Sequence, residues 1–166
     1  MQIKLLTLAA LATTAVADIK GCLETIAAST VQLDKSVTSY QGGLLGLVPI
    51  TTDALCLLND INQCTSTARA SAPLDYEAAL DIAGATGTLA DNVNTVIDDL
   101  VRAKPKFDRL LIVTPIIKVT VEQEREATKE LCKQILAKIP KELADIAAIL
   151  IKQIDDKFAE GIKAFS

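Results

Sequence analysis

The sequence contains no histidine and no tryptophan, and aromatic residues make up only 3% of its 166 residues. Without an imidazole, the chain cannot assemble a Ser-His-Asp or Cys-His catalytic group or a histidine-ligated metal site. Its formal net charge of −4 and its pI near 4.9 argue against a nucleic-acid partner, which would require a basic face. What is present is aliphatic: half of the residues are hydrophobic, mostly Ala, Leu, Ile and Val, and this fraction excludes a disordered chain.

The N-terminal residues are typical of a secretory signal peptide. Lys4 supplies positive charge, residues 5–12 form a short apolar segment, and Ala15-Val16-Ala17 is a small-residue cleavage site. We predict a signal peptide at residues 1–17 and a single mature domain at residues 18–166. The apolar segment is too short to cross a bilayer, and no later run is longer. We therefore expect a secreted, extracellular protein with no membrane span.

Five prolines divide the mature sequence into stretches of helical length. Within them, apolar residues recur at alternating spacings of three and four, which is typical of helices, and no strand-like alternation or hairpin turn appears. We predict an all-α domain, an antiparallel bundle of four to five helices. The expected helices cover about residues 19–40, 51–70, 74–104, 115–135 and 140–165. The pair Gly42-Gly43 is expected to end the first helix, and Thr114 to cap the fourth.

Cysteines 22, 56, 64 and 132 indicate a disulfide in an oxidising compartment. Cys56 and Cys64 would be about 12 Å apart on one helix, which exceeds the roughly 7 Å that a disulfide allows. We expect one bridge among Cys22, Cys64 and Cys132, which lie near the same end of an up-down bundle, without assigning the pair. Because there is no CxxC spacing and no histidine, we expect no zinc site and no other cofactor.

Three threonines interrupt the apolar stripes. Thr30, Thr86 and Thr128 each occupy an inward position on a different predicted helix. Either each hydroxyl donates to the carbonyl four residues earlier in its own helix, or the three form a polar spot that holds a carboxyl headgroup inside an aliphatic cavity.

The charged clusters are interpreted as solvated surface. Neighbouring carboxylates at 98–99 and at 155–156 point about 100° apart on a helix, and residues 122–130 are charged on most sides. The sequence contains no phosphate-binding loop and no nucleophile-elbow motif. We therefore expect that the protein is not an enzyme.

Aliphatic side chains are the candidates for contact with a hydrophobic surface or a lipid. They are Leu44, Leu45, Leu47, Val48, Leu55, Leu58, Leu89, Val93, Leu131 and Ile135. The second helix is expected to bury Leu55 and Leu58. The segment 44–48 is either exposed for contact with a surface or a strap that closes one end of the core.

The order and spacing of several segments resemble the fungal hydrophobic surface-binding protein A family, which includes antigenic cell-wall galactomannoproteins. The main resemblance is Val37-Thr-Ser-Tyr40 followed by Gly42-Gly43-Leu44-Leu45-Gly46-Leu47-Val48-Pro49. Further similar segments are residues 71–77, 100–107, 135–140 and 154–158. The resemblance covers essentially the whole mature chain.

The resemblance implies a secreted fungal all-α domain without catalysis of its own. Family members adsorb to hydrophobic surfaces and recruit a polyester-degrading cutinase there, and others carry long-chain fatty acids between helices or act as cell-wall antigens. This sequence has more cysteines than expected and lacks a Ser/Thr-rich wall-attachment tail, which favours a diffusible protein. The favoured function is non-enzymatic binding of hydrophobic surfaces or lipids. The alternatives are sequestration of fatty acids in a cavity and a structural role as a cell-wall antigen.

Overall fold

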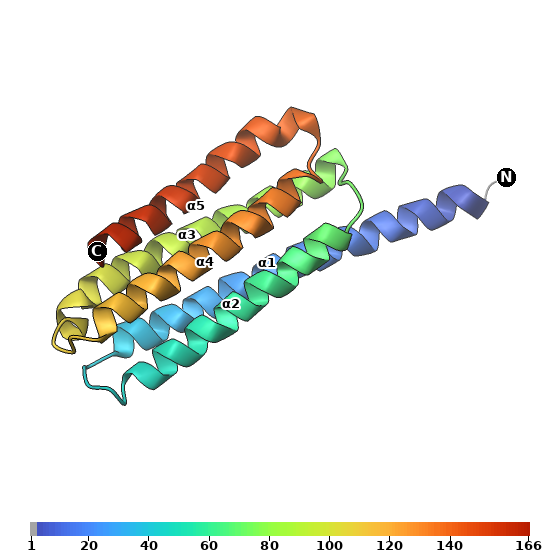
Figure 1. The fold of residues 1–166 in the computed structure, drawn as a ribbon. Helices are drawn as coiled ribbons and strands as arrows, with labels where there is room; N and C mark the ends of the chain where they lie inside the picture. Colours follow the sequence, from blue (N-terminus) through green and yellow to red (C-terminus); the bar gives the residue numbers. More distant parts are fainter. Residues whose placement is uncertain (1–2) are drawn as a thin grey trace.

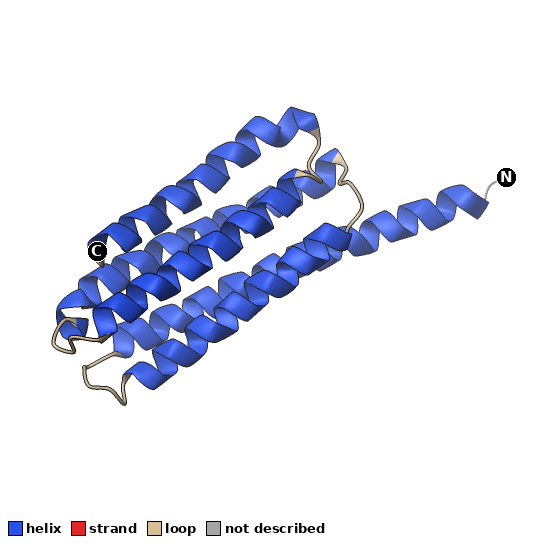
Figure 2. Ribbon diagram, in the orientation of Figure 1, coloured by secondary structure: helices blue, strands red, loops and turns tan. Residues whose placement is uncertain are grey.

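The computed structural model describes the backbone of residues 3–166 and the side chains from Asp18 onward. This part of the chain forms α1 (Ile3–Ser39), α2 (Leu47–Ala70), α3 (Tyr76–Phe107), α4 (Val113–Leu136) and α5 (Ala144–Ala164) (Figure 1). A short 3-10 helix, η1 (Lys141–Leu143), precedes α5. Residues 3–166 contain no strand (Figure 2), and the predicted all-α bundle is confirmed.

The helices form a closed ring rather than a square bundle. Helix α1 packs against α2 and α3, α2 packs against α4, α3 packs against α5, and α4 and α5 complete the ring. Successive helices run in opposite directions, so the α1–α2 loop, the α3–α4 loop and the C-terminus lie at the same end (Figure 1). We call this the loop end. Because five helices enclose a wider interior than four at the same interaxial distance, the interior requires more side-chain volume to fill it.

Three of the aromatic side chains gather in one region of this interior, and a fourth, Phe158, is buried farther along α5. The rings of Tyr40 and Phe107 stack with centroids 4.8 Å apart, and Phe165 lies 6.4 Å from Phe107. These residues stand at the ends of α1, α3 and α5, so they close the core at the loop end. Most of the remaining interior is filled by Ala, Val, Leu and Ile side chains.

Two proline-marked boundaries differ from the prediction because of where proline lies within a helical turn. Pro49 and Pro115 occupy the third positions of α2 and α4, where the backbone N–H has no partner within the helix. Helices α2 and α4 therefore begin before their prolines, and the predicted cap at Thr114 is wrong. The Thr114 hydroxyl instead donates a 2.7 Å hydrogen bond to Asp108. The expected end of α3 at Pro105 is also wrong, because that helix continues to Phe107.

The glycine pair ends the first helix as predicted. Gly42 and Gly43 have φ angles of 110° and 81°, in the left-handed region that glycine adopts without a steric penalty. A third glycine, Gly46, is required for packing, since a Cβ atom there would lie 3.0 Å from the ring of Tyr40.

A disulfide joins α1 to α2. Cys22 and Cys64 are bonded, with their Cα atoms 5.3 Å apart. This confirms the expectation of one bridge among Cys22, Cys64 and Cys132 and identifies its members. Cys132 is a buried free thiol and Cys56 is an exposed one.

The first part of α1 projects beyond the bundle (Figure 1). The predicted signal peptide, residues 1–17, lies outside the residues whose side chains are described and stays a prediction. Among the described residues, none of the helices combines the length and apolar character that a membrane crossing needs.

Candidate functional site

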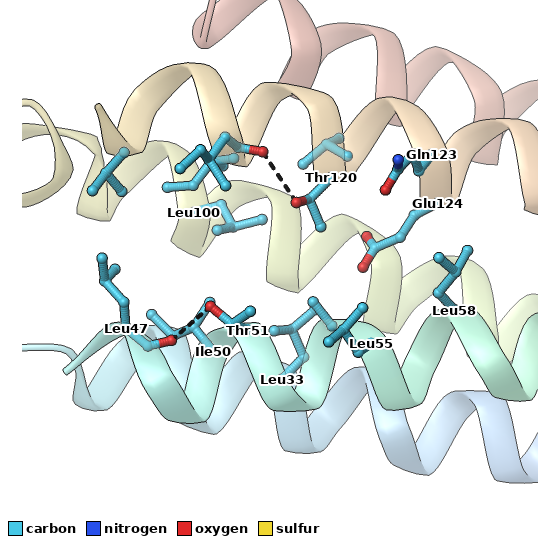
Figure 3. Close-up of a pocket in the computed structure, with 15 residues that line it drawn as sticks. Leu33, Leu47, Ile50, Thr51, Leu55, Leu58, Leu100, Thr120, Gln123 and Glu124 are labelled. Carbon is cyan, nitrogen blue, oxygen red and sulfur yellow. Dashed lines mark hydrogen bonds between the residues drawn. The ribbon is translucent and has the colours of Figure 1, made fainter. Parts of the chain in front are cut away.

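A cavity of about 160 Å³ lies between α2 and α4. Leu33 of α1 and Leu100 of α3 form its floor, so four of the five helices contribute to it (Figure 3). Its lining is mostly aliphatic. The lining residues are Leu33, Leu47, Ile50, Thr51, Ala54, Leu55, Leu58, Leu100, Val113, Ile116, Ile117, Thr120, Val121, Gln123 and Glu124.

The cavity follows from the ring of five helices and from the shortage of aromatic residues. Along the α2–α4 seam, the small side chains of Thr51, Ala54 and Thr120 line the space, and no ring projects into it. Two lining side chains, Leu55 and Ile116, are 63% and 58% exposed. The cavity therefore opens to the surface between α2 and α4.

Two of the four polar side chains in the lining bond within their own helices. The Thr51 hydroxyl donates to the carbonyl of Leu47 at 3.0 Å, and the Thr120 hydroxyl donates to the carbonyl of Ile116 at 3.0 Å (Figure 3). A third, Gln123, is exposed. The fourth, Glu124, is different.

Glu124 is a buried carboxyl group without a hydrogen-bond partner. It is only 4% exposed, and its Oε1 atom accepts no hydrogen bond from any described residue. The side chain extends from α4 toward α2, on the side of Leu55 and Leu58 (Figure 3). Burial raises the pKa of Glu124 to about 8, because a low-dielectric surrounding disfavours the charged form. At neutral pH, Glu124 is therefore an uncharged acid that can donate or accept a hydrogen bond.

The charged residues next to Glu124 on α4 turn away from the cavity. Arg125 donates two hydrogen bonds, of 2.6 and 2.8 Å, to Asp155 of α5. Lys129 also lies 3.6 Å from Asp155, and Lys118 pairs with Glu122. The interpretation of residues 122–130 as solvated surface is therefore wrong at Glu124, the charged residue of this segment that is buried and lines the cavity.

The neighbouring carboxylates at 98 and 99 also differ from each other. Asp98 is exposed and accepts a hydrogen bond from Lys157, as expected for a surface residue. Asp99 is buried, pairs with Arg102 and lies beside Asp34 of α1, whose pKa is raised by burial and by the Asp99 carboxyl. The surface interpretation is wrong for Asp99.

The predicted aliphatic contact residues divide into three groups. Leu47, Leu55 and Leu58 line the cavity. Leu44, Leu45 and Val48 are exposed at the loop end. The remaining four are buried core residues outside the cavity lining: Leu89, Val93, Leu131 and Ile135.

The expected burial of Leu55 is wrong. Ala54 and Leu57 face the core of the bundle instead, which turns Leu55 toward the cavity mouth. Alanine at position 54 gives only a weak signal in an apolar pattern, and the first part of the inward stripe of α2 lies one residue earlier than predicted, so that Leu58 is only half-buried.

The three threonines do not meet at the cavity. The hydroxyls of Thr30 and Thr86 donate at 2.8 Å to the carbonyls of Ile26 and Ile82, four residues earlier in their own helices. Thr128 is buried between α4 and α5, beside Cys132. None of the three lines the α2–α4 cavity.

Sequence reasoning missed Glu124, although the spacing contained a signal for it. The buried positions of α4 include Ile117, Val121, Glu124, Thr128 and Leu131, which recur at spacings of four and three. A charged residue in the register of an apolar stripe indicates either a buried ion pair or a site, and Glu124 has no ion pair in the described part of the chain.

Exposed aliphatic side chains surround the loop-end side of the cavity. They come from two loops and the helix starts that follow them, and we call them the loop-end apolar surface: Leu44, Leu45, Val48, Leu111, Ile112 and Ile116. Ile116 belongs to this surface and to the cavity lining, so the two are continuous. An aliphatic cavity with few polar groups is the usual construction of a site for an apolar ligand.

The fold and this cavity define an all-α domain with an aliphatic cavity between its helices, and sequence comparison identifies its family. The chain belongs to the hydrophobic surface binding protein A family, whose sequence model matches residues 16–137. Curated relatives are also similar. Cell wall mannoprotein 1 of Aspergillus fumigatus is 31% identical over 145 residues, which are 87% of this chain and 50% of that protein.

Cell wall mannoprotein 1 of Talaromyces marneffei is 25% identical over 150 residues, which are 89% of this chain and 31% of that protein. The chain therefore spans about half the length of one curated relative and about a third of the other.

Solved structures with the same fold contain fatty acids. The crystal structure of AFMP4P in complex with palmitic acid superposes with a TM-score of 0.88 at 24% identity, covering 91% of this chain and 99% of that one. Ligand binding domain 1 of Penicillium marneffei MP1, complexed with arachidonic acids, gives a TM-score of 0.87 at 22% identity and covers 92% of this chain and 99% of that one. At these identities the likeness establishes the fold.

Proposed function

We propose that this protein binds long-chain fatty acids, with the aliphatic chain in the cavity between α2 and α4. The observation that carries the proposal is that cavity: aliphatic side chains from four helices line it, and it opens between Leu55 and Ile116. Complexes of similarly folded proteins with palmitic and arachidonic acids support the choice of ligand.

The size of the cavity implies that the bundle adjusts to a long ligand. A cavity of about 150 Å³ accommodates benzene, and this one measures about 160 Å³. It therefore holds only a short segment of a long fatty acid. The rest of the chain lies along the α2–α4 mouth, or α2 and α4 separate to enclose it.

Native mass spectrometry tests this proposal with a matched pair of variants. Thr120 lines the cavity and Thr95 of α3 does not, yet each hydroxyl donates at 3.0 Å to the carbonyl four residues earlier. We expect palmitate to form a one-to-one complex with the wild type and with Thr95→Phe. In Thr120→Phe the ring occupies the cavity, and we expect at least tenfold weaker binding. Equal binding by all three proteins would exclude this cavity, and no binding by any of them would refute the function.

We propose adsorption to hydrophobic surfaces as a second function, carried by the loop-end apolar surface. Leu45 and Leu111 are 88% and 91% exposed and project from two loops at the same end. Full burial of one such side chain contributes about 1.5–3 kcal/mol. The free energy of adsorption from a few of them is therefore large enough to hold the protein on an apolar surface.

Depletion of the protein from solution by hydrophobic beads tests this second function. We expect the double variant Leu45→Ser/Leu111→Ser to adsorb at least tenfold more weakly than the wild type. The control is Ile146→Ser/Ile149→Ser, because these α5 residues are also exposed but lie at the opposite end. Wild-type adsorption should persist or strengthen at high salt. Loss of adsorption at high salt would indicate electrostatic attraction instead.

We further propose that the protein acts outside the cell and has no catalytic activity of its own. The predicted signal peptide and the cell wall mannoproteins among its relatives support an extracellular location. Recruitment of a cutinase rests on the family resemblance and is tested by co-sedimentation of the enzyme with polyester particles, with and without this protein. If neither fatty acids nor surfaces are bound, a structural cell-wall role is the explanation that survives.

A further inference from the structure

Glu124 marks one end of the cavity, and the apolar loops mark the other. Along α4, the lining runs from Val113 at the loop end to Glu124, and along α2 it runs from Leu47 to Leu58. Residues 113 and 124 are about 16 Å apart along the helix axis, at 1.5 Å per residue. The cavity is therefore polarised, with a buried carboxyl at its inner end and exposed aliphatic side chains at its outer end.

The surroundings of Glu124 leave its carboxyl group available to a ligand. The side chains that share the cavity with it from α1, α2 and α3 are uncharged among the described residues. On α2, the charged residues nearest in sequence to the cavity lining are Asp53 and Asp60. They accept hydrogen bonds from Ser36 and Ser29 of α1, respectively.

Charged groups on α3 and α5 also form ion pairs with other residues. On α5, Asp155 is paired with Arg125, and on α3, Asp99 is paired with Arg102. Burial is the cause that raises the pKa of Glu124 to about 8, with no neighbouring charge acting on it. A buried, unpartnered carboxyl group lowers the stability of the fold. Because Glu124 lines the cavity, its carboxyl group is within reach of a ligand bound there.

We propose that Glu124 is the polar anchor of the cavity: its protonated carboxyl donates a hydrogen bond to the carboxylate of a fatty acid whose chain runs outward to the loop-end apolar surface, so that binding depends on Glu124 carrying its proton. This inference rests on the proposed fatty-acid binding and adds the residue, the orientation and the pH dependence.

The two carboxyl groups, one from Glu124 and one from the fatty acid, determine how binding depends on pH. An acid and a carboxylate share one proton in a short, charge-assisted hydrogen bond, and the complex carries one negative charge. When Glu124 ionises, two carboxylates face each other in a low-dielectric cavity and repel. A fatty alcohol has a neutral hydroxyl that can donate to Glu124 in either state, so its binding does not require the proton.

Calorimetric titration with decanoate and with 1-decanol between pH 6.5 and pH 9.5 tests the inference. Decanoate itself is ionised throughout this range. For the wild type, we expect the affinity for decanoate to fall by about tenfold per pH unit above pH 8, while the affinity for 1-decanol stays constant or rises. In Glu124→Gln, whose amide donates at every pH, the affinity for decanoate should not vary with pH.

Glu122→Gln is the matched control, because Glu122 lies on the same helix and pairs with Lys118 outside the cavity lining. It should keep the wild-type pH profile. If decanoate binding shows the same pH profile in the wild type and in Glu124→Gln, or if decanoate and 1-decanol respond alike in the wild type, Glu124 is not the anchor. If the wild type binds neither compound at any pH, the proposed fatty-acid binding itself fails.

Discussion

Replacing Glu124 with glutamine should change how the stability of the ligand-free protein depends on pH. The substitution keeps the shape of the side chain and removes its ability to ionise. In the wild type, the pKa of Glu124 is raised from 4.5 in the unfolded chain to about 8 in the folded one. A raised pKa means that the folded state holds the proton more tightly. The contribution of this proton to the free energy of unfolding is therefore fully present below pH 4.5 and is lost as the pH rises through about 8.

The expected magnitude follows from these two pKa values. Between them, the free energy of unfolding falls by about 1.4 kcal/mol per pH unit. The loss is about 3 kcal/mol at pH 7 and reaches about 5 kcal/mol above pH 9. For a domain whose total stability is about 5–15 kcal/mol, a change of this size is readily measured.

Urea denaturation of both proteins, after refolding to remove bound lipid, measures this effect at pH values from 4 to 9. The difference in unfolding free energy between the wild type and Glu124→Gln isolates Glu124, because both proteins carry the same other charges. We expect this difference to shift toward the variant as the pH rises and to level off above pH 8. A difference that stays constant across the range would show that Glu124 is not buried in an apolar site.

Three further predictions follow from the cysteines and from the α4–α5 ion pair. Replacing Cys22 and Cys64 with serine should lower the free energy of unfolding by about 4 kcal/mol, because the bridge closes a loop with a sequence separation of 42; an unchanged urea midpoint would contradict this. A thiol reagent should modify Cys56 rapidly in the folded protein, whereas Cys132 should react only after unfolding, because it is buried and burial raises its pKa to about 11. Equal rates for the two thiols would contradict their placement. Asp155→Asn should destabilise the protein by about 1 kcal/mol at neutral pH and by less as the pH falls, because the pKa of Asp155 is lowered by its Arg125 partner; urea midpoints at two pH values measure this.

The fold could be predicted from the sequence because its signals are local. Apolar residues at spacings of three and four give the helices, and the glycine pair gives the first loop. The errors at Pro49 and Pro115 share one cause, since proline is tolerated within the first turn of a helix. Pro105 lies within the last turn of α3, which continues to Phe107. Proline therefore marks a helix end only to within a turn.

The site could be predicted less well because it depends on how the helices are arranged. An apolar stripe on α2 contains both Leu57, which faces the core, and Leu58, which lines the cavity, and only the position of α4 distinguishes them. Glu124 lies within a charged segment whose other charged residues are exposed or form ion pairs, so the charge pattern did not indicate a buried carboxyl group. The shortage of aromatic residues had a consequence that composition alone did not reveal: a ring of five helices with aliphatic walls leaves space between α2 and α4.

The most direct test of fatty-acid binding in this cavity is the measurement of intermolecular nuclear Overhauser effects between ¹³C-labelled palmitate and the methyl groups of the protein. We predict contacts from the ligand to Leu58, Leu100 and Ile117, with the carboxyl end of the chain nearest Leu58 and its terminal methyl group nearest Val113. Contacts confined to core residues outside the cavity, such as Leu89 and Leu131, or the absence of contacts from a bound ligand to the α2–α4 lining, would contradict the account.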